Sequence, residues 1–206
     1  MVIVKAANLS PFVLMSDFEL YLGEGIRHIS DLGAYDHILF ITALCAIYQL
    51  TDWKRLLVLV TAFTLGHSAT LALAALKIVS FRTDIIEFLI PITILITCFV
   101  NLSTTNQRQP RAWPRYTMAV FFGLIHGLGF SSYLQSLLGK EESIVVPLFA
   151  FNLGLEIGQL LIVSVILLIT TVLVNVLRIK IRDWTLVLSG GVAGIALTLI
   201  AKTWIF

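Results

Sequence analysis

The chain has 206 residues, of which 58% are hydrophobic and 13% charged, and its mean hydropathy is +0.97. A soluble domain of this size carries about a quarter charged residues, so the composition excludes an ordinary soluble protein. It indicates an integral membrane protein whose partner over most of its surface is the lipid bilayer. The formal net charge is only +2 and the sequence has no basic cluster, which excludes nucleic acid as an expected partner.

Apolar runs, several of them about 18 residues or longer, predict an all-α, polytopic transmembrane helix bundle with about six spans. The fifth run is too long for a helix that stands perpendicular to the bilayer, so it is expected to tilt or to extend past the membrane. The six runs cover Ala34–Leu50, Arg55–Ile78, Thr83–Leu102, Tyr116–Leu138, Ile144–Leu177 and Trp184–Phe206.

The stretch Ser16–Ile29, which precedes the first run, predicts an amphipathic helix rather than a span. Ser16 and Glu19 fit a capping box, and apolar residues recur on one helical face. We expect this helix to lie in the outer membrane interface and to bring His28 to the mouth of the bundle. The chain is therefore expected to divide into an extracytoplasmic N-terminal segment, residues 1–33, and a six-span transmembrane domain, residues 34–206.

Lysine and arginine are distributed unevenly between the loops on the two sides. The loops after spans one, three and five are the richer set, so they are expected to face the cytoplasm. Trp53, Trp113 and Trp184 fall on the same side, as interfacial anchors should. Both termini are then expected outside the cytoplasm. The richer set comprises Lys54, Arg55, Arg108, Arg111, Arg115, Arg178, Lys180 and Arg182.

Three of the four histidines stand inside apolar runs, in the contexts YDHILF (His37), FTLGHSATL (His67) and FFGLIHGLGFS (His126). A charged group at the bilayer centre costs about 2.5–3.5 kcal/mol on insertion scales, and such groups commonly face one another or a wet cavity. Counted along their helices at about 1.5 Å per residue, these histidines, Asp36 and Glu156 reach a similar depth. We therefore expect them to converge on one polar layer inside the bundle.

Imidazole nitrogen with carboxylate oxygen, and without thiolate, suits Zn²⁺, Ni²⁺, Co²⁺ or Mn²⁺ rather than Cu⁺. A carboxylate beside a ligating histidine can instead orient the ring. Cys45 and Cys98 stand apart in apolar runs and predict neither a disulfide nor a thiolate site. The expected ligands of a divalent transition-metal ion are His37, His67, His126, Asp36 and Glu156, with His28 and Asn152 as further candidates.

Glycines accompany several of these residues and predict close approach of helix backbones. Gly66 and Gly127 adjoin His67 and His126, and Gly154 and Gly158 flank Glu156. The last run also holds glycines, for which we expect a packing role only: Gly190, Gly191 and Gly194.

At these residues the sequence resembles the HupE/UreJ family of small bacterial membrane proteins. The resemblance is carried by GIRHISDLGAYDHILF, FTLGHSATLALA, FGLIHGLGFSS and FNLGLEIGQL. It implies a nickel or cobalt permease of the bacterial inner (plasma) membrane, with the histidines and acids as ligands along the path.

The chain departs from the family pattern in two places, as a divergent branch would. Seven residues separate His28 from Asp36, where the family motif has five, and on a continuous helix two additional residues change the phase by about 200°. The family's His-Gly motif that ends in Glu is also absent after His126. Nickel specificity is therefore not assumed, and the ion is expected to be nickel, cobalt or zinc.

Three functions stay open on this evidence. A permease would be passive, gradient-coupled or driven by a further partner, such as a membrane protein or a metallochaperone. The apolar sequence beyond the polar layer, as in LLVLVTAF, offers no obvious exit, which favours an intramembrane metal-dependent hydrolase instead. That enzyme would act on a lipid or a membrane peptide from the outer leaflet, with Glu156 or Asp36 as general base. The third alternative is a non-catalytic membrane assembly partner whose polar layer fixes helix register.

Overall fold

The computed structural model describes residues 17–79, 81–104, 112–138 and 143–204, and these residues form helices and their connections, without a strand. The expected all-α architecture is confirmed. The helices are α1 (Asp17–Ser30), α2 (Asp36–Cys45), α3 (Trp53–Ala75), α4 (Thr83–Thr104), α5 (Ala112–Leu138), α6 (Val145–Thr171) and α7 (Ile181–Lys202). A 3₁₀ turn, Leu50–Asp52, precedes α3, and a π-helical turn, Val172–Val176, continues α6.

Five helices, α3 to α7, are long and apolar enough to cross a membrane. Together with its π-helical turn, α6 forms a span of 32 residues, which agrees with the expectation of an unusually long fifth run. The expected first span differs, because α2 has only ten residues. At about 1.5 Å per residue it covers about half of a bilayer core that is about 30 Å thick.

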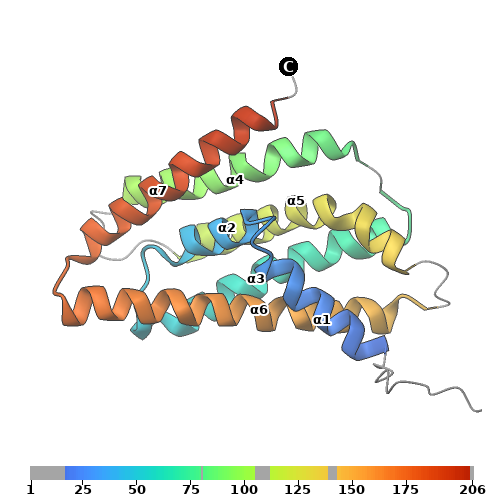
Figure 1. Ribbon diagram of the computed structural model, residues 1–206, viewed down its shortest axis with the longest axis horizontal. Helices are drawn as coiled ribbons and strands as arrows, with labels where there is room; N and C mark the ends of the chain where they lie inside the picture. The colour runs from blue at the N-terminus through green and yellow to red at the C-terminus, as the bar shows by residue number, and fades with distance from the viewer. Residues whose placement is uncertain (1–16, 80, 105–111, 139–142, 205–206) are drawn as a thin grey trace, which may run out of the picture.

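The helices α1 and α2 follow one another from one end of the bundle towards the other (Figure 1). At the first end, the Tyr21 hydroxyl of α1 lies 3.5 Å from the Leu137 carbonyl near the end of α5. At the second end, the Asn101 amide near the end of α4 donates to the Ala43 carbonyl of α2 at 2.7 Å. Two short helices therefore make this first passage through the bundle.

The break between α1 and α2 is the non-helical segment 31–35. Its first residue, Asp31, accepts a hydrogen bond from the Gly33 amide at 2.7 Å and so stabilises a local turn. The helix expected over Ser16–Ile29 is present as α1, although Ser16 of the expected capping box lies outside the described residues.

Glycines hold α3 and α5 together with their backbones in close contact. A Cβ atom added to Gly66 would lie 2.2 Å from the Val120 carbonyl oxygen, and one added to Gly123 would lie 2.2 Å from that of Phe63. No side-chain carbon fits at that distance, so only glycine permits this packing.

The helices α1 and α6 use glycines in the same way. A Cβ atom on Gly25 would lie 2.1 Å from the Phe151 carbonyl oxygen, and one on Gly154 would lie 2.1 Å from that of Leu22. The packing role expected of Gly154 and Gly158 is confirmed. The packing role expected of the glycines in α7 is not, because a Cβ atom on Gly190, Gly191 or Gly194 would meet nothing within 4 Å among the described residues.

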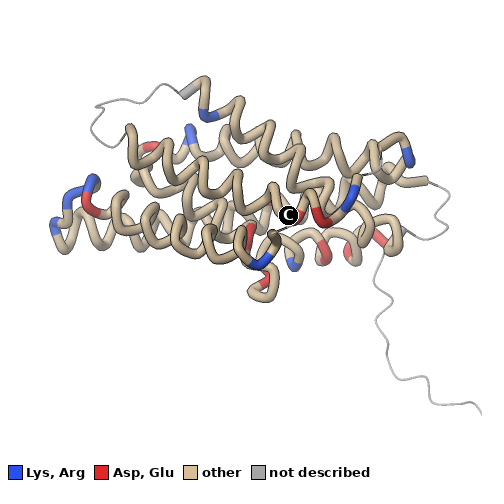
Figure 2. The backbone as a smooth tube through the Cα atoms, turned by 90° about the horizontal axis from the view of Figure 1, so that it is seen from above, with Lys and Arg blue, Asp and Glu red and all other residues tan. Residues whose placement is uncertain are grey.

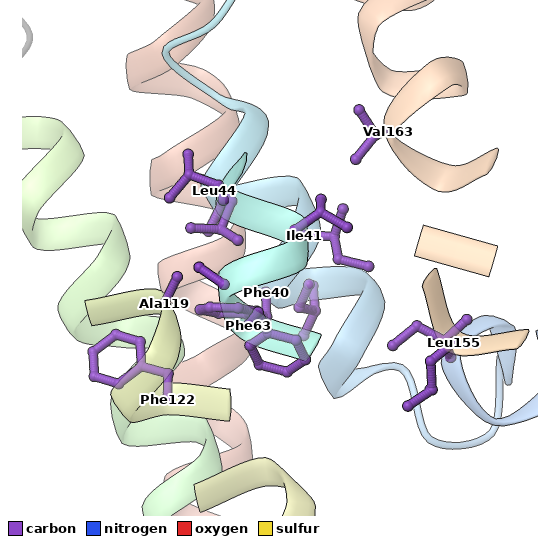
Figure 3. Close-up of a cluster of buried hydrophobic side chains, with 14 of the residues drawn as sticks. Phe40, Ile41, Leu44, Phe63, Ala119, Phe122, Leu155 and Val163 are labelled. Atoms are coloured by element: carbon purple, nitrogen blue, oxygen red, sulfur yellow. The ribbon is translucent and has the colours of Figure 1, made fainter. Parts of the chain in front are cut away.

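Aromatic and aliphatic side chains fill the centre of the bundle between α2, α3, α5 and α6 (Figure 3). Phe40 of α2 and Phe63 of α3 have ring centroids 4.9 Å apart, and Phe122 of α5 lies 6.0 Å from Phe40. All three rings are buried. Each phenylalanine lies about one helical turn from a histidine on the same helix: Phe40 from His37, Phe63 from His67 and Phe122 from His126. In each case the phenylalanine is nearer to the end of the bundle where α2 stops.

A buried polar network lies at that same end. Arg115, expected in a loop, belongs instead to α5 and is 6% exposed. It donates to the Asn101 Oδ1 and Thr104 Oγ1 atoms of α4, each at 2.8 Å. Asn101 also donates to Ser189 of α7 at 3.3 Å. Because Asn101 also bonds to α2, the network joins four helices.

Long stretches without a charged residue separate the charged positions along most helices (Figure 2). This pattern is the one expected of helices that lie in lipid. Of the charges that predicted the orientation, Arg108 and Arg111 lie outside the described residues, as does Phe206, the expected end of the last span.

Candidate metal centre

Three histidines from three helices meet beside the break between α1 and α2. They are His28 near the end of α1, His37 in the first turn of α2 and His67 within α3. One ring nitrogen from each lies within 4.8 Å of the other two. The ring centroids are 4.6 Å apart for His28 and His37, 5.9 Å for His28 and His67, and 6.0 Å for His37 and His67.

The position of His28 shows why its spacing from Asp36 does not disturb the cluster. The expected change of about 200° in helical phase applies only to a continuous helix. Residues 31–35 are not helical, so the direction of α2 is independent of the direction of α1. His37 can therefore lie beside His28. The expected shift in helical phase therefore does not separate His28 from His37.

A fourth histidine, His126 of α5, lies beside the three, with its ring centroid 5.3 Å from that of His37. Its Nδ1 atom is 2.8 Å from the Phe122 carbonyl oxygen one turn earlier. A carbonyl oxygen only accepts, so Nδ1 carries the proton and Nε2 presents a lone pair. His126 is 1% exposed, so this lone pair lies inside the bundle.

The tautomer of His37 is fixed in the same way by Asp36. One carboxylate oxygen, Asp36 Oδ1, accepts hydrogen bonds from the His37 backbone amide at 2.9 Å and from His37 Nδ1 at 3.1 Å. The proton on Nδ1 leaves Nε2 free to bind a cation. Asp36 thus occupies the orienting position that the sequence offers as the alternative to direct ligation.

All four histidines have buried ring nitrogens that find no hydrogen-bond partner among the described residues. A buried polar atom left without a partner costs about 1–3 kcal/mol, and native proteins contain few of them. Several in one place indicate a ligand that these nitrogens share. The atoms are Nε2 of His28, His37 and His126, and both ring nitrogens of His67.

The spacing of the cluster fits a small metal ion after a modest contraction. A tetrahedral ion with metal–nitrogen bonds of about 2.0 Å holds its ligand nitrogens about 3.3 Å apart. The three nitrogens lie within 4.8 Å of one another, so rotations that move each ring by about an ångström would bring them to that distance.

Glycine packing sets the depth of two of these histidines. A Cβ atom on Gly127 would lie 2.5 Å from the His67 carbonyl oxygen and 2.2 Å from Thr70 Oγ1. Because glycine alone allows this contact, α3 and α5 are in close backbone contact beside His67 and His126. The two adjoining glycines that the sequence singles out therefore position the cluster.

A partly open cavity of about 600 Å³ leads to the cluster from the end where α4 begins and α5 ends. Its wall contains four carboxylates, Glu24, Asp31, Asp36 and Glu87, and one guanidinium, Arg27. Arg27 forms an ion pair with Glu24 at 2.6 Å. The remaining carboxylates give the cavity a negative potential that attracts cations.

Glu156, an expected ligand, does not belong to the cluster. Its Oε1 atom accepts a hydrogen bond from Thr61 of α3 at 2.7 Å, and Thr61 lies six residues before His67. Asn152 donates to the Leu148 carbonyl at 2.8 Å, whereas its Oδ1 atom is buried without a partner. The structure therefore brings together the four histidines with Asp36 beside them, and it places Glu156 elsewhere.

These features define a multi-pass helical membrane protein with a buried histidine cluster at the base of an acidic cavity. The sequence model of the HupE / UreJ protein family matches residues 5–206, which is nearly the whole chain, and the chain belongs to that family. No curated protein and no solved structure matches it significantly.

Proposed function

We propose that this protein is a membrane permease for a divalent transition-metal ion and that the histidine cluster binds the ion on its way. The single observation that carries the proposal is the group of buried, unpartnered ring nitrogens at the base of the acidic cavity. Membership of the HupE / UreJ family supports a role connected with nickel or cobalt transport.

The chemistry of the donors selects the class of ion. Imidazole nitrogen prefers Ni²⁺, Co²⁺ and Zn²⁺, whereas Mg²⁺ and Ca²⁺ prefer oxygen ligands. The imidazoles bring no negative charge of their own, so a bound divalent ion gains its charge balance from Asp36 and from the cavity carboxylates. The protein thus attracts a hydrated cation with oxygen atoms and binds it with nitrogen atoms.

The path beyond the cluster is closed in this conformation. Phe40, Phe63 and Phe122 fill the next level of the bundle (Figure 3), so the ion reaches the cluster from one end only. With the orientation expected from the basic loops, the cavity faces the extracytoplasmic side. Transporters commonly move an ion from such a one-sided state by rearranging interrupted helices, and the break between α1 and α2 supplies one.

Uptake of radioactive nickel or cobalt into liposomes that carry the purified protein tests the proposal. We expect uptake by the wild-type protein and its loss in His67→Leu and in His126→Leu. Thr97→Val is the matched control, because Thr97 is a buried polar residue of α4 whose hydroxyl donates to the Thr93 carbonyl of its own helix. Folded wild-type protein that moves none of these ions would overturn the proposal.

The closed path favours a second candidate, an intramembrane metal-dependent hydrolase. A cavity of about 600 Å³ holds a substrate group as well as an ion, and Asp36 lies beside the cluster to serve as general base. Glu156 no longer fits that role, because Thr61 holds its carboxylate outside the cluster. This candidate predicts about one metal ion retained per chain through dialysis, since a resident ion must stay bound during turnover, and no ion flux.

The third candidate, an assembly partner without a ligand, predicts no metal binding. Histidines that only fix helix register would have their ring nitrogens hydrogen-bonded, and the unpartnered nitrogens argue against it. Whether a metallochaperone delivers or receives the ion stays a prediction.

A further inference from the structure

An apolar groove of about 610 Å³ lies between α3 and α6, at the end of the bundle where α3 begins. Leu50, Trp53 and Leu57 form one wall, and α6 between Leu160 and Thr171 forms the other. None of its described lining residues also lines the cavity that leads to the histidines. The groove is therefore separate from the candidate metal centre.

The groove offers its occupant an almost wholly apolar surface. Apart from Trp53, its lining side chains are leucine, valine, one serine and one threonine. The Ser164 and Thr171 hydroxyls donate to the Leu160 and Leu167 carbonyls one turn earlier on α6, each at 2.7 Å. Since both hydroxyl groups bond within their own helix, the groove suits a hydrocarbon chain rather than a polar ligand.

The length of the groove indicates what kind of hydrocarbon fits it. Thr171 stands eleven residues after Leu160, which is about 17 Å along a helix axis. Half of a bilayer core is about 15 Å thick, so the groove is as long as the acyl-chain region of one leaflet. A second transmembrane helix needs about 20 residues, or about 30 Å, and would extend well beyond the groove. The length therefore favours a lipid chain over another helix.

A positive charge stands at the mouth of the groove. The Lys54 ammonium lies 5.7 Å from the ring centroid of Trp53, whose side chain lines the groove. Arg55 forms an ion pair with Asp52 at 3.3 Å, whereas no ion pair between the described residues includes Lys54. Lys54 is exposed and can therefore donate hydrogen bonds to an anion from outside the chain.

Further basic residues lie at the same end of the bundle. There α3 begins and α6 with its π-helical turn ends (Figure 1), and the 3₁₀ turn before α3 contacts α6. The connection from α6 into the first turn of α7 carries more positive than negative charge. Its charged residues, all exposed, are Arg178, Lys180, Arg182 and Asp183. Basic groups at the ends of membrane helices attract anionic lipid head groups.

We propose that the groove binds one anionic phospholipid, with an acyl chain between α3 and α6 and the head-group phosphate at Lys54. Inside a bilayer every neighbour is apolar, so the hydrophobic effect does not select one chain over another. Selection comes instead from the fit of the chain in the groove and from the charge at its mouth. The site does not depend on the proposed permease, since its described lining contains no histidine.

Native mass spectrometry of the detergent-purified protein tests the proposal, in titrations with phosphatidylglycerol or with phosphatidylcholine of the same acyl chains. The wild type should retain one phosphatidylglycerol molecule per chain. It should bind this lipid at least about fivefold more tightly than phosphatidylcholine, which is the contribution of one basic residue near an anionic lipid. The titration contains no metal ion, so its failure would leave the permease standing.

Two variants separate the charge from the groove. Lys54→Gln should lower the affinity for phosphatidylglycerol about fivefold and leave that for phosphatidylcholine unchanged. Its matched control is Lys202→Gln, at the opposite end of the bundle where α7 ends. Ser164→Phe should weaken both lipids, because the added ring fills the groove. Its matched control is Val165→Phe, which places the same ring at an exposed position of α6 outside the groove.

Several results would overturn the proposal. They are equal binding of the two lipids by the wild type, the wild-type preference in Lys54→Gln, and wild-type binding in Ser164→Phe. A protein dimer whose yield falls in Ser164→Phe would also overturn it, because the groove would then be an interface between two copies of the chain.

Fluorescence in nanodiscs gives a second measurement, which does not need a filled groove. Phosphatidylglycerol with brominated acyl chains, as a minor component of phosphatidylcholine nanodiscs, should quench Trp53. The signal of Trp53 is the difference between the wild type and Trp53→Phe. Brominated phosphatidylcholine at the same fraction should quench it less, and equal quenching by the two lipids would contradict a selective site.

Discussion

Two buried polar regions occupy this bundle, and they differ in how their hydrogen bonds are met. In the network at the end where α2 stops, Arg115 donates to Asn101 and Thr104, and Asn101 in turn bonds to α2 and α7. In the histidine cluster, each ring leaves at least one buried nitrogen without a partner. Burying polar groups costs free energy in both regions. Only in the first region do hydrogen bonds between the described residues offset that cost.

The difference separates a structural role from a functional one. A polar group whose bonds are satisfied within the chain fixes the helices to one another, as Asn101 does for four of them. In the histidine cluster, hydrogen bonds fix the tautomers of His37 and His126, and the buried nitrogens that they leave unused can bind a ligand that is not part of the chain. The comparison therefore predicts that changes in the cluster affect ion binding, whereas changes in the network affect stability.

The largest effect is expected from His67→Leu, which removes the most deeply buried imidazole of the cluster. Affinity for Co²⁺ should fall more than about 100-fold, beyond the loss typical of changes in groups that only orient a ligand. The free energy of unfolding should change by less than about 1 kcal/mol, because leucine fills the space and removes unpartnered atoms. Calorimetric titration with Co²⁺ measures the first quantity, and denaturant titration in mixed micelles measures the second.

The control for His67→Leu is Phe63→Leu, one turn earlier on α3, which should retain affinity for Co²⁺. If His67→Leu bound Co²⁺ as tightly as the wild type, the proposed difference in role between the histidine cluster and the Arg115 network would be wrong.

Arg115→Met should have the opposite profile. It leaves Asn101 Oδ1 and Thr104 without the charged donor, so the free energy of unfolding should fall by about 2–3 kcal/mol. Affinity for Co²⁺ should stay within about twofold of the wild type, since Arg115 contacts no histidine. The same two titrations provide the measurement, and a loss of cobalt binding in well-folded Arg115→Met would contradict the separation of roles.

Asp36→Ala tests whether this carboxylate acts by orienting His37. Without its acceptor, the His37 ring loses both its fixed tautomer and its direction, and affinity for Co²⁺ should fall about 10–100-fold. Asp36→Asn retains an oxygen that accepts from Nδ1, so its loss should be smaller. If the two substitutions lower the affinity equally, Asp36 acts through its charge rather than through the hydrogen bond.

The smallest effect is expected from Gly190→Ala on α7, where an added Cβ atom meets nothing within 4 Å among the described residues. The free energy of unfolding should change by less than about 0.5 kcal/mol. The matched substitution Gly123→Ala places the same carbon 2.2 Å from the Phe63 carbonyl oxygen and should cost about 1–3 kcal/mol. Similar costs for both would mean that α7 packs against a neighbour outside the chain.

The depth of the site could be predicted from the sequence because a helix rises by a constant amount per residue. His37, His67 and His126 therefore fall at one level, as expected from their positions in the apolar runs. The direction of each side chain around its helix is not fixed in this way. Glu156 bonds to Thr61, six residues before His67 on α3, and the contact of Gly154 and Gly158 with α1 sets the rotation of α6.

Arg115, at the end of the bundle where α2 stops, is a second residue whose side-chain direction could not be predicted from the sequence. In the sequence it stands beside the arginines of the loop after the third span, and positive charge in a loop predicts which side of the membrane the loop faces. In the fold, α5 begins earlier than expected, and the guanidinium turns inward to Asn101. Whether a basic residue lies in water or among buried acceptors depends on a neighbouring helix that the local sequence does not describe.

By itself the sequence determined the all-helical membrane architecture, the family and the residues able to bind a metal ion, because composition, apolar length and residue chemistry are properties of the chain. Only the tertiary structure decided that the first expected span contains a helix of only ten residues, that His28 joins the cluster and that Glu156 stands apart. These features depend on where a helix breaks and how each helix is rotated, and the close contacts between helices set both.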